Sequence, residues 1–260
     1  MDNTSNLYFI LGGKGFVGSA FVRFCQSAGK DYVVIDRQNY DSHVGKSCDV
    51  LINASGSSSK VLAAKDPLQD FDTTVRNTKK TLIDFKYKKY VMISSCDVYP
   101  DCSSPNTTKE DMIVDVSKQS PYGFHKYLAE ECVRHATPDW LIVRLGGMVG
   151  PGLKKNPIFD ILNGGPIWLD PKSQLQYMKT DDVAKITFML IQKGFKQEVF
   201  NVCGKGLVKL EDIMDSKISV NHNSPLVKYD INTDKISRLT DVPNSVDAVM
   251  NFIQENKRLI

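Results

Sequence analysis

Short, uninterrupted apolar segments alternate with segments of helical periodicity through the first half of the chain. Polar residues do not interrupt these segments at every second position, so the pattern is typical of strands that are buried on both faces. Strands of this kind belong to parallel sheets that crossover helices cover on both sides. The sequence therefore predicts an α/β fold with a doubly wound parallel sheet. The expected strands are 7–11, 32–35, 50–52, 90–93 and 141–143, and the expected helices are 16–28, 70–86 and 122–135.

The character of the chain changes after Gly150-Pro151-Gly152, where glycine, proline and other turn residues become frequent. Two helices are still expected there, one beginning near Asp181 and one over 245–255. At 260 residues the chain suffices for one full core and is short for two independent domains. We expect residues 1–150 to form the sheet domain. Residues 151–260 are expected to form a smaller substrate-binding cap on the carboxyl edge of the sheet, where open α/β sheets bind ligands.

The first expected strand leads directly into a turn that contains Gly12, Gly15 and Gly18 and that precedes a helix. Glycines suit a tight turn, a close approach of the backbone to a pyrophosphate, and close packing of the helix on the strand. The amino end of the helix adds N–H donors and the positive end of its dipole. Because a strand precedes the turn and a helix follows it, the sequence predicts a Rossmann-like dinucleotide site that includes Phe16 and Val17.

The end of the second expected strand indicates which dinucleotide binds. Asp36 stands where the motif needs an acid to accept hydrogen bonds from the adenosine ribose, and this acid favours NAD. Arg37 and Lys14 are each able to pair with the 2′-phosphate of NADP, although both also fit exposed surface charges. We expect NAD(P) as the cofactor, with NAD preferred.

Composition restricts the kind of partner. A formal net charge of +3 gives no reason to expect a nucleic-acid partner. The six cysteines are scattered, with no Cys-x-x-Cys and no histidine at metal spacing, so we expect reduced thiols and no metal site. No apolar segment approaches the length of a membrane span, and the polar first residues do not resemble a signal peptide. These features predict a cytoplasmic protein without a membrane partner.

Ser95, Tyr122 and Lys126 form a candidate catalytic set. Tyr122 and Lys126 are one helical turn apart and share a face of the expected helix, while Ser95 follows the strand 90–93. A tyrosine with its ordinary pKa of about 10 is a poor base at neutral pH, so acid–base work needs a nearby cation. The spacing alone also fits an ordinary surface pair. Together with the glycine turn, the set favours proton transfer at a carbon that exchanges hydride with a dinucleotide.

Several further segments resemble the extended short-chain dehydrogenase/reductase family, which comprises nucleotide-sugar epimerases, dehydratases and reductases. Residues 49–56 resemble the family's strand that ends beside the cofactor, and residues 143–152 resemble the strand and turn before its substrate portion. Residues 177–184 resemble a segment within that portion, so the resemblance extends over nearly the whole chain. It implies that the cofactor also contacts Ala54, Ser55 and Gly56.

The resemblance also implies roles for the catalytic set. Tyr122 is expected to be the acid or base that exchanges a proton with a substrate hydroxyl. Lys126 is expected to lower the pKa of Tyr122 and to hydrogen-bond the nicotinamide ribose, and Ser95 to hydrogen-bond the same substrate oxygen. The expected substrate contacts are Ser95, Cys96, Asp97, Tyr122, Lys154 and Tyr177.

The residues after Ser95 bear on the type of reaction. The 4,6-dehydratases of this family carry an Asp-Glu pair directly after the serine or threonine. Cys96 replaces the first acid of that pair, so the acid that would expel water is missing and a 4,6-dehydratase is disfavoured. Asp97 occupies the place of the second acid and fits equally a base for proton abstraction or a loop carboxylate.

Other departures from the family concern the nucleotide. Gly147 and Leu175 stand where many members have an asparagine and an arginine that hold the nucleotide diphosphate. Lys154 or Lys155 is able to replace such a phosphate contact, although surface charge is the simpler interpretation of both. The short interval between residues 36 and 49 also predicts that one crossover helix is reduced or missing.

We therefore expect an NAD(P)-dependent oxidoreductase or epimerase that acts on a secondary alcohol or ketone of a nucleotide-linked sugar, as a 4-ketoreductase or 4-epimerase. One alternative is a reductase of a non-sugar ketone. Another is a non-catalytic dinucleotide-binding sensor, a class that usually lacks the tyrosine or the lysine which this chain keeps as Tyr122 and Lys126. The resemblance further implies a homodimer in which the helices 70–86 and 122–135 pack on their symmetry mates.

Overall fold

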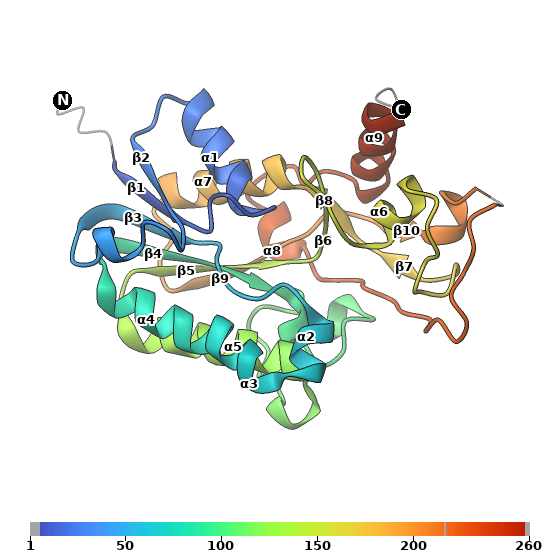
Figure 1. Cartoon of the computed structure of the whole chain (residues 1–260), viewed down its shortest axis with the longest axis horizontal. Coiled ribbons are helices and arrows are strands. Elements are labelled where there is room, and N and C mark those ends of the chain that lie inside the picture. Colours follow the sequence, from blue (N-terminus) through green and yellow to red (C-terminus); the bar gives the residue numbers. More distant parts are fainter. Residues whose placement is uncertain (1–5, 216, 258–260) are drawn as a thin grey trace.

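A six-stranded parallel sheet lies at the centre of the structure, a computed structural model that describes residues 6–215 and 217–257 (Figure 1). Its strand order is β2-β1-β3-β4-β5-β9, and every neighbouring pair is parallel. This arrangement confirms the predicted α/β fold with a Rossmann-like doubly wound sheet. The strands are β1 (Tyr8–Leu11), β2 (Tyr32–Ile35), β3 (Ser47–Asn53), β4 (Lys86–Ser95), β5 (Trp140–Leu145) and β9 (Glu198–Val202).

Helices cover both faces of this sheet (Figure 1). On one face, α1 (Gly18–Ser27) packs against α7 (Thr180–Gln192), and the rings of Phe24 and Phe188 stack with their centroids 4.2 Å apart. On the other face lie α4 (Asn77–Asp84) and α5 (Pro121–Ala136). Ile10 belongs to the first core and its neighbour Leu11 to the second, which explains why the strands are apolar without interruption.

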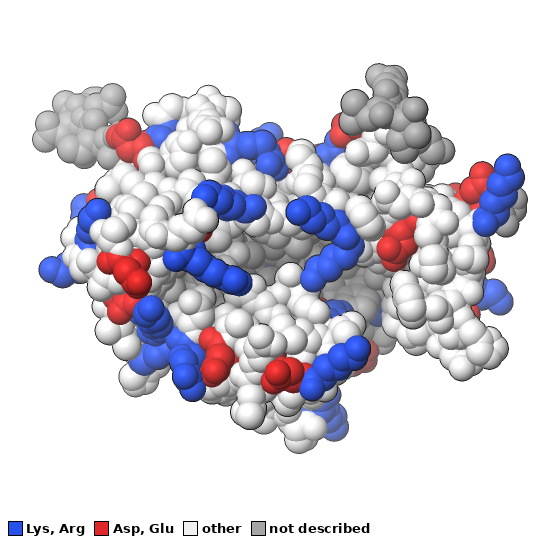
Figure 2. All heavy atoms as spheres, viewed as in Figure 1, with Lys and Arg blue, Asp and Glu red and all other residues white. Residues whose placement is uncertain are grey.

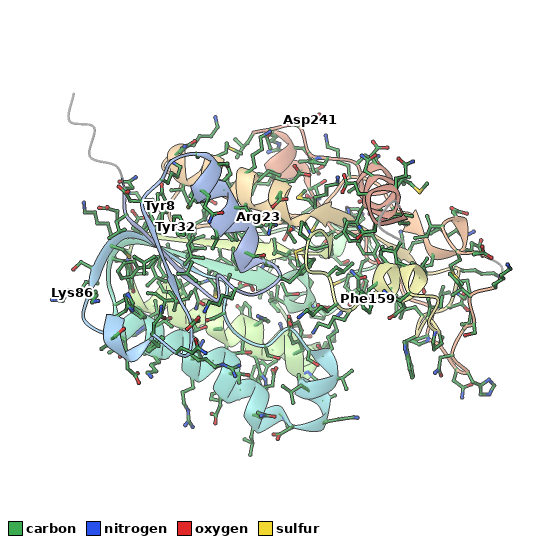
Figure 3. The ribbon with its side chains drawn as sticks, turned by 45° about the horizontal axis from the view of Figure 1, so that its top comes forward. Tyr8, Arg23, Tyr32, Lys86, Phe159 and Asp241 are labelled. Atoms are coloured by element: carbon green, nitrogen blue, oxygen red, sulfur yellow. The ribbon has the colours of Figure 1, made fainter. Side chains whose placement is uncertain are left out.

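The connection from β2 to β3 is short. It contains a single 3-10 turn, Asp41–His43, where a longer chain would carry a full crossover helix, so the predicted reduction of one helix is confirmed. Tyr8 and Tyr32 stand opposite each other at the start of β1 and β2 (Figure 3). β2 therefore joins the sheet in parallel despite the abbreviated path.

The prediction of one helix over 70–86 is wrong in its bounds and its regularity. The chain forms α3 (Pro67–Phe71), then a π-helical turn over 72–76, and then α4, which ends at Asp84. The start is earlier because Asp66 caps the helix by accepting a hydrogen bond from the amide of Gln69. The end is earlier because β4 already begins at Lys86 and its Lys89 is buried in an ion pair with Asp139.

The chain beyond residue 150 divides between the central sheet and a smaller layer at one end of it (Figure 1). α7 covers the sheet and β9 extends it, so the sheet draws on both sides of the expected boundary. The role of residues 151–260 in substrate binding stays a prediction. The smaller layer contains β6 (Gly147–Val149), β7 (Gln174–Leu175), β8 (Tyr177–Lys179), β10 (Val208–Lys209), α6 (Pro157–Leu162) and α9 (Ser245–Lys257), whereas α8 (Asp234–Ser237) packs against β9 of the central sheet.

Two properties of the described residues concern the environment of the protein. No helix within 6–215 or 217–257 has the length and apolar character that crossing a bilayer requires. All six cysteines are free thiols, and the sulfur atoms of Cys96 and Cys203 lie 3.4 Å apart in the interior.

Candidate active site

The predicted site residues gather where β1, β3 and β4 end. Strand order reverses around β1, with β2 on one side and β3 on the other, and such a reversal opens a crevice at the carboxyl edge of the sheet. Gly12 follows β1, Ala54 follows β3, and Ser95 is the last residue of β4. Tyr122 and Lys126 lie in the first two turns of α5. The sheet therefore brings the predicted dinucleotide turn and the predicted catalytic set to the same edge.

The glycine turn has the close contacts that its sequence predicts. Gly12 adopts a φ of +74°, which glycine tolerates without strain, and a Cβ there would lie 2.8 Å from the carbonyl oxygen of Ala54. A Cβ on Gly18 would overlap the carbonyl oxygen of Gly12, so α1 begins in direct contact with the turn. The amide of Gly15 donates to that same oxygen over 2.8 Å. Backbone therefore borders the place where a pyrophosphate would lie at the amino end of α1, and these residues fit a dinucleotide.

Asp36 lies beside this turn as an ionised acceptor. The Lys14 ammonium is 2.5 Å from its Oδ2 atom, and the amide of Gln38 donates to Oδ1 over 2.8 Å. The Lys14 contact, followed by the hydrogen bond from Gln38, holds the pKa of Asp36 below its ordinary value. Arg37 is exposed at the next position. The carboxylate that a ribose diol needs is therefore present, and Lys14 already has a partner of opposite charge.

The loop after β3 lies between the predicted dinucleotide turn and Lys126. The amide and the hydroxyl of Ser55 both donate to the side-chain oxygen of Asn53, over 3.0 and 2.6 Å. Asn77 on α4 donates to the Ser55 hydroxyl over 3.0 Å and fixes the loop from the other side. Gly56 follows with a φ of +112°, and a Cβ there would be 3.8 Å from the ammonium of Lys126. The predicted segment from Ala54 to Gly56 thus borders Lys126.

Tyr122 and Lys126 lie in the buried part of α5. The helix begins with Pro121 and is capped by Ser120, whose hydroxyl accepts a hydrogen bond from the amide of Gly123 over 3.1 Å. Only 8% of Tyr122 and 6% of Lys126 are exposed, so the interpretation as an ordinary surface pair does not hold. The Lys126 ammonium lies 5.6 Å from the centroid of the Tyr122 ring.

Burial dominates the electrostatics of this pair. Burial lowers the pKa of Lys126 to about 8, against the opposing charges of Asp70, Asp97 and Glu130. Burial also raises the pKa of Tyr122 well above its ordinary value, and the charge of Asp97 adds to the rise. A hydrogen bond with Ser95 acts in the opposite direction. Tyr122 therefore needs positive charge beside it before it can act as a base near neutral pH.

Ser95 and Asp97 face Tyr122 because α5 touches the turn that follows β4. A Cβ on Gly123 would overlap the carbonyl oxygen of Asp97, so only glycine permits this approach of helix to turn. The turn is a 3-10 helix over Cys96–Val98, and the Ser95 hydroxyl accepts a hydrogen bond from the amide of Asp97 over 3.2 Å. The same hydroxyl donates to the Oδ2 atom of Asp97 over 3.0 Å. The structure thus places Ser95, Asp97 and Tyr122 in one cluster.

Two residues that the sequence did not single out complete this cluster. Lys60 begins α2 (Lys60–Lys65), and its ammonium lies 2.6 Å from the Oδ1 atom of Asp97. Tyr229 donates to the same oxygen over 2.7 Å and accepts from Lys60 over 2.7 Å. Ser59 caps α2, which was a local signal for that helix, but no local pattern connects Tyr229 with a site so far away along the chain.

The other expected substrate contacts occupy different places. Cys96 is buried, 3.4 Å from the sulfur of Cys203. Tyr177 lies in a separate apolar cluster with Val149 and Ile158, and its buried hydroxyl has no hydrogen-bond partner among the described residues. Substrate contacts by these residues stay predictions.

Lys154 and Lys155, the expected replacements for a lost phosphate contact, are both exposed. Lys155 donates to the carbonyl oxygen of Ser58 over 2.6 Å, beside the loop that leads into α2. Of the two, Lys155 is therefore the one that the structure brings close to the segment carrying Lys60, and a phosphate contact by either stays a prediction.

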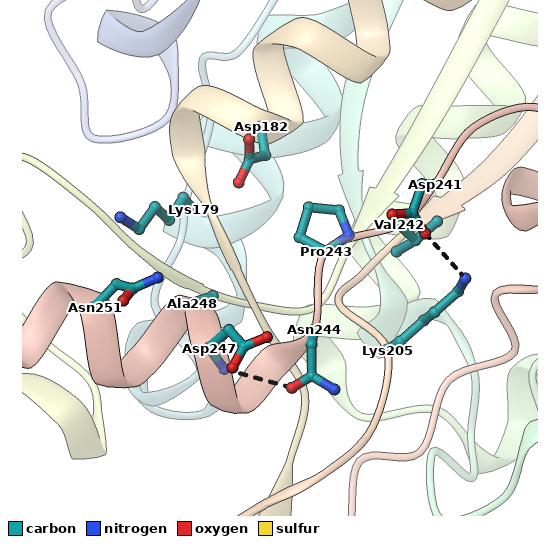
Figure 4. A pocket seen from close by; sticks show the side chains of 10 residues that line it. All are labelled: Lys179, Asp182, Lys205, Asp241, Val242, Pro243, Asn244, Asp247, Ala248 and Asn251. Carbon is teal, nitrogen blue, oxygen red and sulfur yellow. Dashed lines mark hydrogen bonds and ion pairs between the residues drawn. The ribbon is translucent and has the colours of Figure 1, made fainter.

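Two hollows differ in their relation to the cluster. One of about 290 Å³ is lined by Asp97, Ser120 and Tyr229 and so borders the catalytic set. The larger one, of about 630 Å³, lies between the start of α7 and the start of α9 and contains none of the predicted site residues (Figure 4). Charges of both signs line the larger hollow, where Lys205 pairs with Asp241 over 3.6 Å. Lys and Arg side chains also surround the central recess on the face drawn in Figure 2. Of the two hollows, only the smaller one touches the cluster, through Asp97 and Tyr229.

Comparison with known proteins agrees with this geometry. Residues 8–203 match the family model described as "NAD dependent epimerase/dehydratase family". A search of curated protein sequences finds no match to the chain.

Solved structures similar to the chain include three that cover almost all of it. MoeE5 in complex with UDP-glucose and NAD has a TM-score of 0.81 at 14% identity, over 98% of this chain and 99% of that one. UDP-glucuronic acid 4-epimerase from Bacillus cereus, with UDP-glucuronic acid and NAD, has a TM-score of 0.77 at 17% identity, over 98% and 100%. A dTDP-4-dehydrorhamnose reductase from Clostridium acetobutylicum has a TM-score of 0.77 at 15% identity, over 96% and 99%. At such identities these similarities establish the shared fold.

Proposed function

We propose, because the chain belongs to the NAD dependent epimerase/dehydratase family, that it interconverts a secondary alcohol and a ketone on a nucleotide-linked sugar, as a 4-ketoreductase or a 4-epimerase. Membership makes the chain an NAD-dependent enzyme of the extended short-chain dehydrogenase/reductase type. The finer assignment rests on the cluster at the carboxyl edge of the sheet that contains Ser95, Tyr122 and Lys126, which a small hollow borders at Asp97.

One observation carries the proposal: Tyr122 and Lys126 are both buried, the Lys126 ammonium lies 5.6 Å from the centroid of the Tyr122 ring, and Ser95 lies close enough to the phenol to lower its pKa. Burying an ammonium costs free energy, so a chain keeps one where its charge is used. A phenol between a cation and a hydroxyl suits an acid or base that serves one substrate oxygen.

In this reaction some residues of the site would bind the cofactor and others would transfer the proton. Gly12, Gly15 and Gly18 would hold the pyrophosphate of the cofactor and Asp36 its ribose, and the bound nicotinamide supplies the acceptor or donor of hydride. Tyr122 takes the proton from the substrate hydroxyl in oxidation or returns it to the oxygen in reduction. Ser95 hydrogen-bonds that oxygen and orients it. Lys126, charged below its pKa of about 8, favours the ionised phenol.

Asp97 supports an epimerase or ketoreductase over a dehydratase. Its Oδ2 atom accepts from Ser95, and its Oδ1 atom accepts from Lys60 and Tyr229. Both carboxylate oxygens of Asp97 are thus engaged by neighbouring side chains. Removing a carbon-bound proton beside a ketone would require Asp97 to give up one of these contacts.

Turnover by matched variants tests the proposal. The purified protein is assayed with UDP-glucose, UDP-galactose, UDP-glucuronic acid and a dTDP-4-keto sugar, together with NAD(H) or NADP(H). Tyr122→Phe should reduce turnover by about 100-fold or more while cofactor binding, followed by fluorescence, is preserved. Tyr127→Phe removes a hydroxyl from the next turn of the same helix and should keep full activity. A fully active Tyr122→Phe protein would exclude the proposed chemistry.

The state of the cofactor separates the two versions of the reaction. An epimerase regenerates its cofactor within each cycle, so denaturing the freshly purified protein should release near-stoichiometric NAD, which mass spectrometry identifies. A ketoreductase exchanges its cofactor, so the protein should emerge empty and then bind added NADH or NADPH. The preferred form of that added cofactor also tests the role of Asp36 beside Lys14 and Arg37.

A second candidate function is the reduction of a ketone without a nucleotide. Gly147 stands where many relatives have an asparagine, and a Cβ at that position would lie 2.5 Å from the carbonyl oxygen of Gln176. No larger side chain fits there without a backbone shift, so this phosphate contact is lost rather than conservatively replaced. Turnover of simple cyclic ketones in a panel where every nucleotide sugar fails would favour this candidate.

A further inference from the structure

We propose that Lys60 is a positioning residue of this site, which acts through Asp97 and Ser95 to compensate the carboxylate beside Tyr122 and so sets how readily the phenol ionises. The inference rests on the proposed role of Tyr122 as the acid or base. It assigns to the site a second lysine, which comes from α2 and which the Tyr-x-x-x-Lys pattern does not contain.

A continuous set of contacts leads from Tyr122 to Lys60. Ser95 lies close enough to the Tyr122 phenol to lower its pKa, and the Ser95 hydroxyl donates to Asp97 over 3.0 Å. The other carboxylate oxygen of Asp97 lies 2.6 Å from the Lys60 ammonium. Tyr229 closes a triangle with these two groups, and its ring centroid lies 4.7 Å from the ammonium. A change of charge at Lys60 is therefore transmitted to Tyr122 through one carboxylate and one hydroxyl.

The carboxylates that face the buried pair each have their own partner. Asp70 on α3 lies 2.7 Å from the Nδ1 atom of His125. Glu130, further along α5, forms a two-point contact with the buried guanidinium of Arg144, over 3.0 and 2.7 Å. Asp97 is the third, and its cationic partner is Lys60. The Lys126 ammonium itself lies 5.6 Å from the centroid of the phenol ring. Removing Lys60 would thus leave uncompensated the one carboxylate that Ser95 connects to Tyr122.

The exposure of Lys60 makes this role separable from folding. More than half of its side chain, 55%, is exposed, whereas the Asp97 side chain is 16% exposed. Loss of the ammonium therefore removes a charge from the rim of the site without opening a cavity in the core. Lys65, at the other end of the same helix, offers a matched control with the same change of charge.

The test measures the ionisation of Tyr122 directly. Protein labelled with ¹³C at the tyrosine Cζ position is titrated with saturating NAD⁺, and Tyr122→Phe identifies the signal. Lys60→Met should raise the titration midpoint by about one pH unit, the size expected when a nearby carboxylate loses its partner. Asp97→Asn should lower it. In the Asp97→Asn background, Lys60→Met should shift the midpoint less, because the exposed ammonium no longer has a carboxylate partner and is solvated by water instead. Lys65→Met should leave the midpoint unchanged.

The order of the midpoints decides the outcome. The inference requires Asp97→Asn below the wild type and the wild type below Lys60→Met. Equal midpoints for the wild type and Lys60→Met, an equal shift in Lys65→Met, or a phenol that stays protonated to pH 11 in every variant would overturn it. Thermal melts check that each variant is folded. The readout needs no turnover, so a failure of the proposed reaction on every sugar tested remains distinct from a failure of this inference.

Discussion

The ammonium of Lys126 is held where water is scarce, and this has a consequence for stability that can be measured. Its pKa falls from an ordinary 10.5 to about 8, chiefly through burial. At pH values below 8 the Lys126 side chain is protonated in both the folded and the unfolded chain. Burying the charged ammonium then destabilises the folded state by roughly 3 kcal/mol. Between pH 8 and 10.5 the folded chain releases the proton while the unfolded chain keeps it, so the cost disappears as the pH rises.

Lys126→Met should therefore stabilise the cofactor-free protein while it abolishes turnover. We expect the free energy of unfolding at pH 7 to rise by about 1–3 kcal/mol, because methionine keeps most of the volume without the charge. The gain should shrink towards zero by pH 10.5. Urea unfolding at pH 7 and pH 10 measures both values, with Lys65→Met as the exposed control. A variant that is less stable at pH 7 would show that the ammonium contributes to folding instead of opposing it.

At the residue scale, the sequence could predict the groups that belong to local patterns. Gly12, Gly18, Tyr122 and Lys126 are fixed by short-range spacing, and the structure brings them to one edge of the sheet. Lys60 was beyond such reasoning because its role depends on a contact with Asp97, on another element. Tyr229 depends in the same way on tertiary packing, which no spacing within the chain encodes.

At the scale of elements, the contact between α5 and the turn after β4 brings the proposed catalytic groups together. Gly123→Ala should cost about 1–3 kcal/mol in the free energy of unfolding, since the added methyl would overlap the carbonyl oxygen of Asp97. Inside an unobstructed helix the same change would be favourable by about 1 kcal/mol. A decrease in the free energy of unfolding would therefore report the clash with Asp97. Turnover should fall more than stability suggests, because the methyl pushes Ser95 and Asp97 away from Tyr122.

Gly165→Ala provides the comparison for that variant. The nearest atom to a Cβ at Gly165 is the carbonyl oxygen of Asp160, 3.9 Å away, so the methyl meets only ordinary contact. Chemical denaturation and steady-state kinetics of the two variants, side by side, give the effect of the α5 contact. Equal behaviour of Gly123→Ala and Gly165→Ala would contradict the proposed role of this contact.

The apolar periodicity of the sequence reports which faces of an element are buried, and it does not report local irregularities of a helix. Strands were predictable because burial on both faces leaves an uninterrupted apolar run, as in Ile10 and Leu11. The π-helical turn over 72–76 was not, because it shifts the register of a helix without changing its composition. The beginning of β4 was missed because Lys86 to Lys89 resemble a helix end, and only the ion pair with Asp139 shows why Lys89 is tolerated inside.

At the scale of the whole molecule, the expected homodimer remains a prediction with a definite site. The outer side of the α3–α4 segment carries two exposed apolar side chains, Leu68 and Ile83, with 79% and 70% exposure. If this segment packs on a symmetry mate, Ile83→Glu should shift the protein from dimer to monomer, because an unpaired charge would be buried. Light scattering at micromolar concentration measures the mass. Met250→Glu, on α9, serves as the control, and a monomeric wild type would reject the dimer.

The position of β9 late in the chain affects how the protein folds during its synthesis. Synthesis delivers β1 to β5 first, and the outer edge of β5 has no partner until Glu198–Val202 has left the ribosome. Between the emergence of β5 and the emergence of β9 from the ribosome, the nascent chain therefore carries an open strand edge to which another copy could pair. Molecular chaperones and the speed of translation should influence the yield of active protein most strongly in that interval. A chain truncated before β9 would keep the whole catalytic set and still be prone to aggregation.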